Sequence, residues 1–75
     1  MKVYRNRTTK SGVTHYEPGE TWIDVKFVGR TKPYRYRESR IGAGHLREMK
    51  RLADAGEGLA TYISQHPEVN AGHDP

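Results

Sequence analysis

The sequence predicts a small α+β domain, in which a three-stranded antiparallel meander is followed by two short helices packed on one sheet face. Two segments with alternating apolar residues, 22–28 and 34–37, indicate strands. An apolar spacing typical of helices begins after Ile41 and continues on both sides of Gly56. The chain of 75 residues has room for one domain of this kind.

We expect strands at residues 13–17, 22–28 and 34–37. The first two are separated by a Glu-Pro-Gly-Glu turn at 17–20, and the third follows a basic loop at 29–33. Side chains alternate across a strand. One face of the sheet should therefore carry Ile23, Val25, Phe27, Tyr34 and Tyr36, and the other Trp22, Asp24, Lys26, Arg35 and Arg37.

The first helix should start near Ser39 or at 42–44 and end at Gly56, a residue type that favours the left-handed conformation of a helix cap. A second helix over 59–66 should stop at Pro67. The predicted core joins both helices to the sheet through Ile23, Val25, Phe27, Tyr34, Tyr36, Ile41, Leu46, Met49, Leu52, Leu59, Tyr62 and Ile63.

Both ends of the chain are expected to lie outside the main domain, residues 13–66. Residues 1–12 are basic and predict either a loose arm or an edge strand, where charge would discourage aggregation. Residues 67–75 contain little apolar mass, and we expect them to form a disordered tail.

The composition is polar, with 33% hydrophobic residues and a mean hydropathy of −0.97. The absence of cysteine excludes disulfides and thiolate metal sites and favours a reducing cytoplasm. No apolar run is long enough to span a bilayer, and the N-terminus lacks the apolar region of a signal peptide, so we expect no membrane partner.

Positive charge is concentrated in the first half of the chain. Residues 1–37 contain nine Lys/Arg and three Asp/Glu and have a net charge of +6. Residues 38–75 contain four Lys/Arg and six Asp/Glu and have a net charge of −2. This asymmetry indicates a polyanionic partner for the sheet, although a merely solvated surface would give the same pattern.

The candidate binding residues lie on the predicted open sheet face and in its basic loop: Trp22, Lys26, Arg30, Lys32, Arg35 and Arg37. Cations neutralise phosphates, and an exposed aromatic ring can stack on a base. Alternatively, Trp22 is half-buried and these charges have no ligand. Tyr34 and Tyr36 could themselves form a stacking platform, but alternating aromatics in a central strand are more often core.

Other constellations favour no specific chemistry. Acidic residues interrupt the basic group of Arg47, Lys50 and Arg51, and this pattern indicates a solvated helix face. The histidines lack the spacing of a metal site, and His45 with Glu48 has no nucleophile placed beside it. We therefore expect no metal, no cofactor and no enzymatic activity.

The ordered set of motifs between Val13 and Ile63 resembles the KTSC domain, a small module named for the C-terminus of some lysyl-tRNA synthetases. The matching stretches are the Tyr-Glu-Pro-Gly turn at 16–19, the Ile-Asp-Val-Lys-Phe strand at 23–27, Tyr34-Arg35-Tyr36, and Gly56. The chain departs from the family pattern at Gly42, where Pro is frequent, and at 58–60. The resemblance implies the fold above, a free-standing bacterial or phage protein, and RNA binding as the usual suggestion.

The leading hypothesis is a non-enzymatic module that binds RNA or another nucleic acid on its sheet face. The rival hypothesis is a phage-type inhibitor or adaptor, for example an anti-CRISPR protein, that contacts a host protein. A homodimer that closes an exposed sheet edge is a third alternative.

Overall fold

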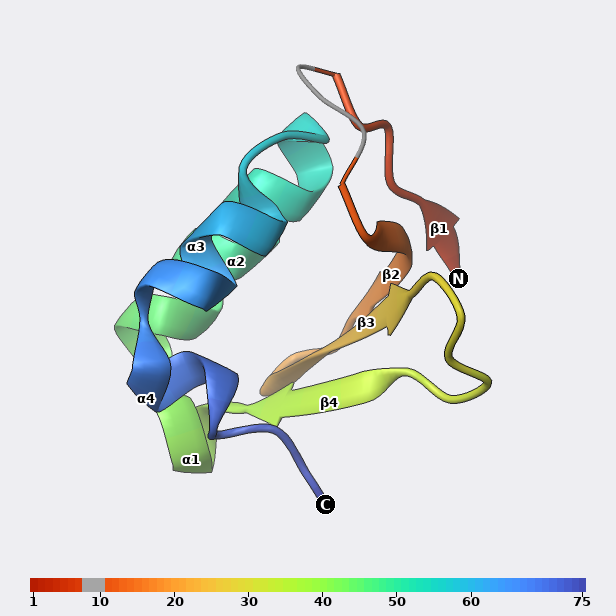
Figure 1. The fold of residues 1–75 in the computed structure, drawn as a ribbon. Coiled ribbons are helices and arrows are strands. Elements are labelled where there is room, and N and C mark those ends of the chain that lie inside the picture. The colour runs from red at the N-terminus through yellow and green to blue at the C-terminus, as the bar shows by residue number, and fades with distance from the viewer. Residues whose placement is uncertain (8–10) are drawn as a thin grey trace.

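The structure, a computed structural model, describes residues 1–7 and 11–75. Two layers are visible in Figure 1, an antiparallel sheet and a group of helices that covers one of its faces. The strands lie across the sheet in sequence order, β1-β2-β3-β4. This arrangement confirms the predicted α+β class, and no helix in the described part of the chain covers the other sheet face.

Three of the strands are those predicted: β2 (Val13–Pro18), β3 (Trp22–Phe27) and β4 (Tyr34–Arg37). The predicted number of three strands is wrong, because β1 (Lys2–Val3) pairs antiparallel with β2. Two residues are too few for an alternating pattern, and the sequence left residues 1–12 as either a loose arm or an edge strand.

The N-terminal segment is an edge strand that continues directly into the core. The Tyr4 side chain is only 3% exposed, and its hydroxyl oxygen accepts a hydrogen bond from the Leu59 backbone N–H at 3.1 Å. The Tyr4 N–H in turn donates to the Thr14 carbonyl at 2.9 Å. Residues 1–7 are therefore part of the domain, while residues 8–10 of the predicted arm lie outside the described residues.

Four helices follow the sheet: α1 (Glu38–Ile41), α2 (Ala43–Ala55), α3 (Leu59–Gln65) and α4 (Pro67–Asn70). The two longer helices are the predicted pair, and α2 ends as expected at Gly56, which has a φ of 75°. The Gly56 N–H donates to the carbonyls of Leu52 and Ala53, which satisfies the end of the helix. A Cβ at Gly56 would also lie 2.6 Å from Arg5 Cβ, so this glycine allows the N-terminal segment to approach.

The prediction of a disordered tail is wrong. Val69 is fully buried in α4, and beyond the helix the chain returns to the sheet, where His73 forms an isolated bridge with Tyr36. The Asp74 N–H donates to the Arg35 carbonyl at 2.8 Å. A polar segment thus becomes ordered through one buried apolar side chain and through backbone pairing with β4.

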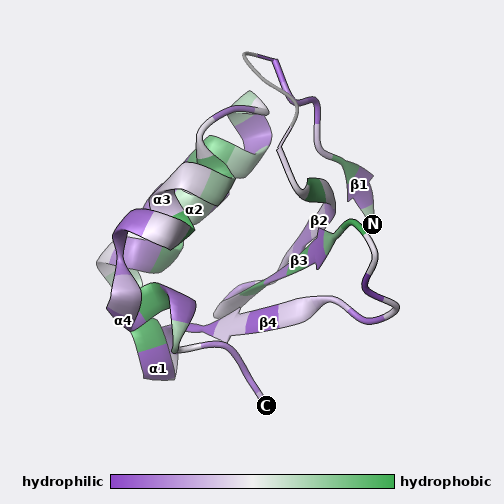
Figure 2. Ribbon diagram, in the orientation of Figure 1, coloured by the Kyte–Doolittle hydropathy of each residue, from purple (hydrophilic) through white to green (hydrophobic). Residues whose placement is uncertain are grey.

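The core lies between the sheet and the helices and takes buried residues from both layers. Figure 2 marks the hydrophobic positions of the strands and helices in green. Of the predicted core residues, Phe27, Tyr34, Leu52 and Tyr62 are only partly buried and the other eight are buried. The structure adds five buried residues to the prediction: Tyr4, Val13, Tyr16, Ala53 and Val69. None of the helices in the described part of the chain is long and apolar enough to cross a membrane.

Candidate nucleic-acid interface

The strand register brings the predicted open-face residues together. Trp22 lies opposite Arg37, and Asp24 lies between Glu17 on β2 and Arg35 on β4. Lys26 lies opposite His15. These pairs occupy the face that the helices leave uncovered, because the alternate positions of the same strands are buried.

Arg35 contacts two neighbouring side chains on this face, Asp24 and Trp22. Its Nε and one terminal nitrogen donate to the two carboxylate oxygens of Asp24 at 2.7 and 2.9 Å. Its guanidinium carbon also lies 3.9 Å from the centroid of the Trp22 ring. The hydrogen bond to Asp24 raises the pKa of Arg35. The positive charge of Arg35 is therefore compensated by a neighbouring carboxylate.

Trp22 is half-buried and packed against its surroundings. Apart from the guanidinium of Arg35, the backbone of Gly19 lies so close that a Cβ there would fall 2.1 Å from Trp22 Cε2. The ring thus holds the β2–β3 turn and Arg35 in place. The predicted role of Trp22 as a stacking platform has little support in this arrangement, because its neighbours already occupy the ring.

Arg37 is paired with the C-terminal segment. Its Nε donates to Asp74 Oδ2 at 2.8 Å, and the ring of His73 stacks on Tyr34 with centroids 4.4 Å apart. On the open face, Arg35 and Arg37 are thus matched by Asp24 and Asp74. The sequence placed Asp24 on this face without predicting its pair with Arg35, whereas Asp74 reaches Arg37 only because the C-terminal segment returns to the sheet.

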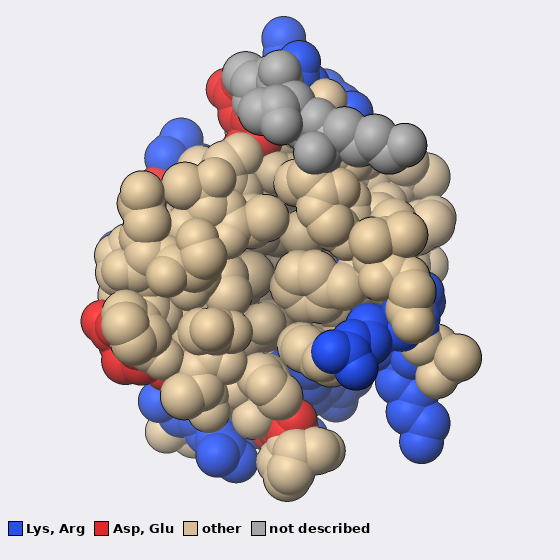
Figure 3. All heavy atoms as spheres, viewed as in Figure 1, with Lys and Arg blue, Asp and Glu red and all other residues tan. Residues whose placement is uncertain are grey.

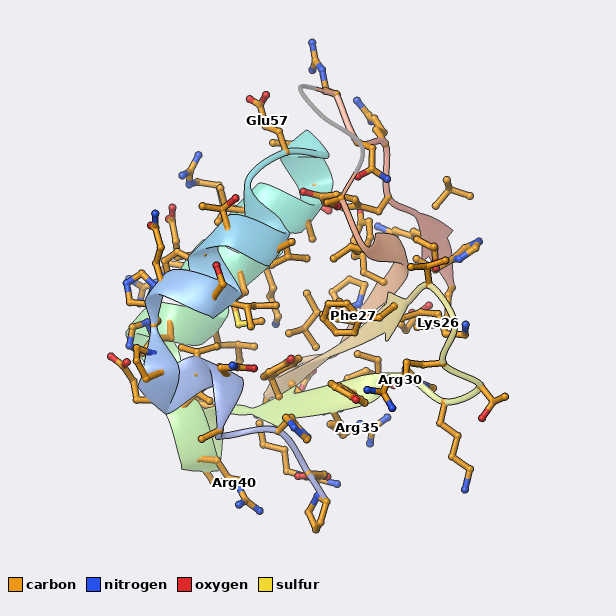
Figure 4. All side chains as sticks on the ribbon, viewed as in Figure 1. Lys26, Phe27, Arg30, Arg35, Arg40 and Glu57 are labelled. Atoms are coloured by element: carbon orange, nitrogen blue, oxygen red, sulfur yellow. The ribbon has the colours of Figure 1, made fainter. Side chains whose placement is uncertain are left out.

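The three remaining candidates, Lys26, Arg30 and Lys32, lie at the end of β3 and in the loop that leads to β4. Arg30 and Lys32 are exposed, Lys26 is partly exposed, and none forms an ion pair with a residue among 1–7 and 11–75. In Figure 4, Lys26 points away from the helices and Arg30 lies beside β4. We call Lys26, Arg30 and Lys32 the basic loop cluster; it carries three charges without an acidic partner in the described structure.

A hollow opens beside this cluster, between β4 and α3. Its volume is about 320 Å³, and Arg30 lies among its lining residues together with Phe27, Tyr34, Tyr36, Ala60, Ile63, Ser64 and Asn70. The guanidinium carbon of Arg30 lies 6.0 Å from the centroid of the Tyr34 ring. We call this space the β4–α3 hollow. The sequence reasoning missed it, because its walls come from the sheet and from two helices.

Two of the three basic residues of α2, Lys50 and Arg51, have structural partners. Arg51 Nε donates to Glu48 Oε1 at 2.9 Å, and this pair lowers the pKa of Glu48. The Lys50 ammonium donates to the carbonyls of Gly19 and Glu20, which ties α2 to the β2–β3 turn. Of the three, Arg47 alone has no such contact within the described part of the chain, so this surface gathers little free charge.

A cluster on the helices escaped the sequence reasoning. His45 Nδ1 lies 2.5 Å from the Tyr62 hydroxyl, and His45 Nε2 lies 3.3 Å from a carboxylate oxygen of Glu68. His66 Nδ1–H donates to the Tyr62 carbonyl at 2.7 Å, and its ring stacks on that of Tyr62. These contacts join α2, α3 and α4. Within residues 1–7 and 11–75, no group of three or more His, Cys, Asp or Glu is arranged to hold a metal ion.

Comparison of the sequence with protein-family models, with curated proteins and with solved structures found no match. The resemblance to the KTSC domain therefore remains a prediction carried by the residues quoted for it.

Proposed function

We propose that this chain is a non-enzymatic binding module that holds RNA, or another polyanion, at the basic loop cluster of its sheet. One observation supports this proposal above the others. Lys26, Arg30 and Lys32 have no acidic partner among the described residues, whereas Arg35 and Arg37 are each paired with a carboxylate. Unpaired cations are the groups that gain most from a phosphate, because they lose no existing ion pair on binding.

The neighbourhood of the cluster favours a single-stranded partner. The partly buried rings of Phe27 and Tyr34 lie beside Arg30, with ring centroids 5.3 Å apart. Single-stranded nucleic acids are commonly held by cations that follow the backbone and by rings that contact unstacked bases. The resemblance to the KTSC domain, for which RNA binding is the usual suggestion, points the same way. The lack of cysteine favours a cytoplasmic module.

The proposal is tested by fluorescence anisotropy of labelled single-stranded RNA at about 50 and 200 mM salt. Three phosphate contacts should give a log–log slope of about −2, so affinity should fall roughly twentyfold over this range. The double variant Arg30→Ala/Lys32→Ala should bind about tenfold more weakly at the lower salt concentration.

A matched control is available on the helices. Arg40 and Arg47 are both exposed and form no ion pair with any residue in the described ranges, so Arg40→Ala/Arg47→Ala removes the same charge elsewhere. Equal weakening by the two double variants would mean that net charge alone attracts RNA. Absence of saturable binding by the parent at low salt would contradict the proposed function.

A second candidate is a phage-type inhibitor or adaptor that contacts a host protein. Val28, at the start of the loop, is 68% exposed and follows Phe27, which lines the β4–α3 hollow. An exposed apolar side chain beside a hollow is typical of a surface that binds an apolar side chain of a partner protein. Such a partner should show mild salt dependence and a large loss of affinity for one apolar substitution, such as Val28→Asp.

A further inference from the structure

The β4–α3 hollow lies between the sheet and the helical layer. In Figure 3 the middle of the side toward the viewer is free of charged side chains, and both acidic and basic side chains lie along its borders, with basic ones at the lower right. The hollow has a volume of about 320 Å³. Ligand pockets range from about 300 to 1,000 Å³, so a ring system with one or two substituents is the appropriate size.

The walls of the hollow are aromatic on the sheet side and aliphatic on the helical side. Phe27 points from the end of β3 toward the helices in Figure 4, and its ring is tilted 54° to that of Tyr34. Tyr34 is held in turn by His73, whose ring stacks on it at 4.4 Å. Across the hollow lie Ala60 and Ile63 of α3. Fixed aromatic walls of this kind favour a flat, unsaturated ligand.

Polar groups that could recognise such a ring lie among the same lining residues. The Ser64 hydroxyl donates to the Thr61 carbonyl at 3.0 Å, which leaves its oxygen free to accept. The Asn70 side chain lines the hollow and makes no hydrogen bond within the described residues. An amide offers both donors and an acceptor, the pattern that pairs with the edge of a base.

The lining of the hollow includes one positively charged side chain, Arg30. None of the other lining residues in the described part of the chain is acidic. Lys26 and Lys32 lie four and two residues from Arg30 in the sequence. An anionic substituent on the ligand would therefore meet positive charge, and a guanidinium suits a phosphate because of its fork of N–H donors.

We propose that the β4–α3 hollow binds one nucleotide, with its base against Phe27 and Tyr34 and its phosphate on Arg30. This inference rests on the proposed function and names the part of the nucleic acid that enters the fold. The same chemistry is offered by a free mononucleotide and by one unstacked nucleotide of an RNA strand.

The experiment follows backbone amide shifts by NMR while adenosine 5′-monophosphate, uridine 5′-monophosphate or inorganic phosphate is added to the full chain. Either nucleotide should shift the amides of Phe27, Tyr34, Ala60 and Ser64, and phosphate alone should shift only the basic loop. Short RNA should shift the same set at lower concentration if the nucleotide comes from a strand.

Filling the hollow separates this inference from the charge-based function. Ala60→Leu fills part of the hollow with a larger side chain without altering charge. Its control is Ala43→Leu, at an exposed alanine that lines a different hollow at the start of α2. We expect Ala60→Leu to weaken nucleotide binding at least tenfold and RNA binding several-fold, with an unchanged salt slope. If Ala60→Leu does not fold, Ser64→Leu at an exposed lining position serves the same purpose.

The outcomes distinguish the two proposals. RNA binding that is lost in Arg30→Ala/Lys32→Ala but unchanged in Ala60→Leu would overturn the nucleotide hollow and leave the proposed function standing. Nucleotide shifts in the hollow without binding of RNA would support the hollow and contradict RNA as the partner. Shifts of the same residues with an aromatic peptide and not with nucleotides would overturn the inference in favour of a protein partner.

Discussion

Arg35 extends across the open face of the sheet so that its guanidinium lies over the indole of Trp22, 3.9 Å from the ring centroid. The same guanidinium donates two hydrogen bonds to Asp24. Two residues that the sequence presents as ligand-binding groups thus contact each other. Because these residues already contact each other and Asp24, we place the candidate site at the basic loop cluster and not in the middle of the sheet.

Arg35→Ala should lower stability more than it lowers RNA binding. The substitution leaves the Asp24 carboxylate, whose side chain is 13% exposed, without its partner and uncovers the Trp22 ring. Urea unfolding monitored by Trp fluorescence should show a clearly lower midpoint for Arg35→Ala than for Arg40→Ala, at an exposed residue of α1. Equal midpoints would show that the Arg35 contacts contribute nothing to the fold.

Val69→Ala tests whether the C-terminal segment belongs to the fold. Val69 is fully buried, so its truncation should cost about 1–3 kcal/mol of unfolding free energy through lost burial and a small cavity. Urea unfolding measures this cost, and Gln65→Ala at an exposed position of α3 is the control. A value for Val69→Ala within about 0.5 kcal/mol of zero would restore the disordered tail that the sequence predicted.

Two glycines should respond in opposite directions to alanine. At Gly72 a Cβ would lie 2.6 Å from Ile41 Cγ2 and 2.8 Å from the Glu68 carbonyl oxygen, so Gly72→Ala should destabilise the protein. At Gly44, inside α2, a Cβ would meet nothing within 4 Å, and Gly44→Ala should stabilise it by about 0.5 kcal/mol through helix propensity. Thermal unfolding of both variants should give midpoints on either side of the parent's, and the same sign for both would contradict the packing described here.

Stability should decline at high pH because of Tyr36. Burial, with a smaller effect of Tyr34, raises the pKa of Tyr36 to about 12, above the value of about 10 for an unfolded tyrosine. The neutral phenol is favoured in the fold, so its contribution is complete below pH 10 and is lost as the pH rises through 12. The difference corresponds to about 3 kcal/mol.

Urea midpoints of the parent and of Tyr36→Phe between pH 9 and 12 measure this contribution. The parent should lose more stability than the variant over this range, although Tyr16 and Tyr62, whose pKa values are also raised, titrate in both proteins. Parallel pH profiles would mean that the Tyr36 phenol ionises without cost.

The sequence predicted those strands and helices whose apolar residues recur at regular spacing. Alternation identified β3 and β4 and the faces of their side chains, and helical spacing identified α2, α3 and the cap at Gly56. Tyr4, which follows Val3, and Val69 lie in short segments that are otherwise mostly polar, and no periodic pattern marks them. Their burial depends on contacts with distant parts of the chain, such as the hydrogen bond between Tyr4 and Leu59.

The candidate site was predicted by residue type but not by charge balance. Alternation correctly placed Arg35 and Arg37 on the open face, yet their pairing with Asp24 and Asp74 depends on strand register and on the return of the C-terminal segment. The basic loop cluster was included in the prediction. It differs from Arg35 and Arg37 in forming no ion pair among the described residues, although Lys32 lines a hollow together with both arginines. The hollow beside it could not be predicted, because packing between layers determines its walls.

The most direct test compares RNA affinity in two double variants that remove equal charge, Arg30→Ala/Lys32→Ala and Arg35→Ala/Arg37→Ala, by anisotropy across the same salt series. The loop variant should lose about tenfold in affinity, and its log–log salt slope should become shallower by about 1.4, at about 0.7 per lost phosphate contact. The strand variant, if folded, should keep most of the parent's affinity and most of its salt slope. A larger loss of affinity and of salt slope in the strand variant would show that RNA binds at Arg35 and Arg37 in the middle of the sheet, and not at the basic loop cluster.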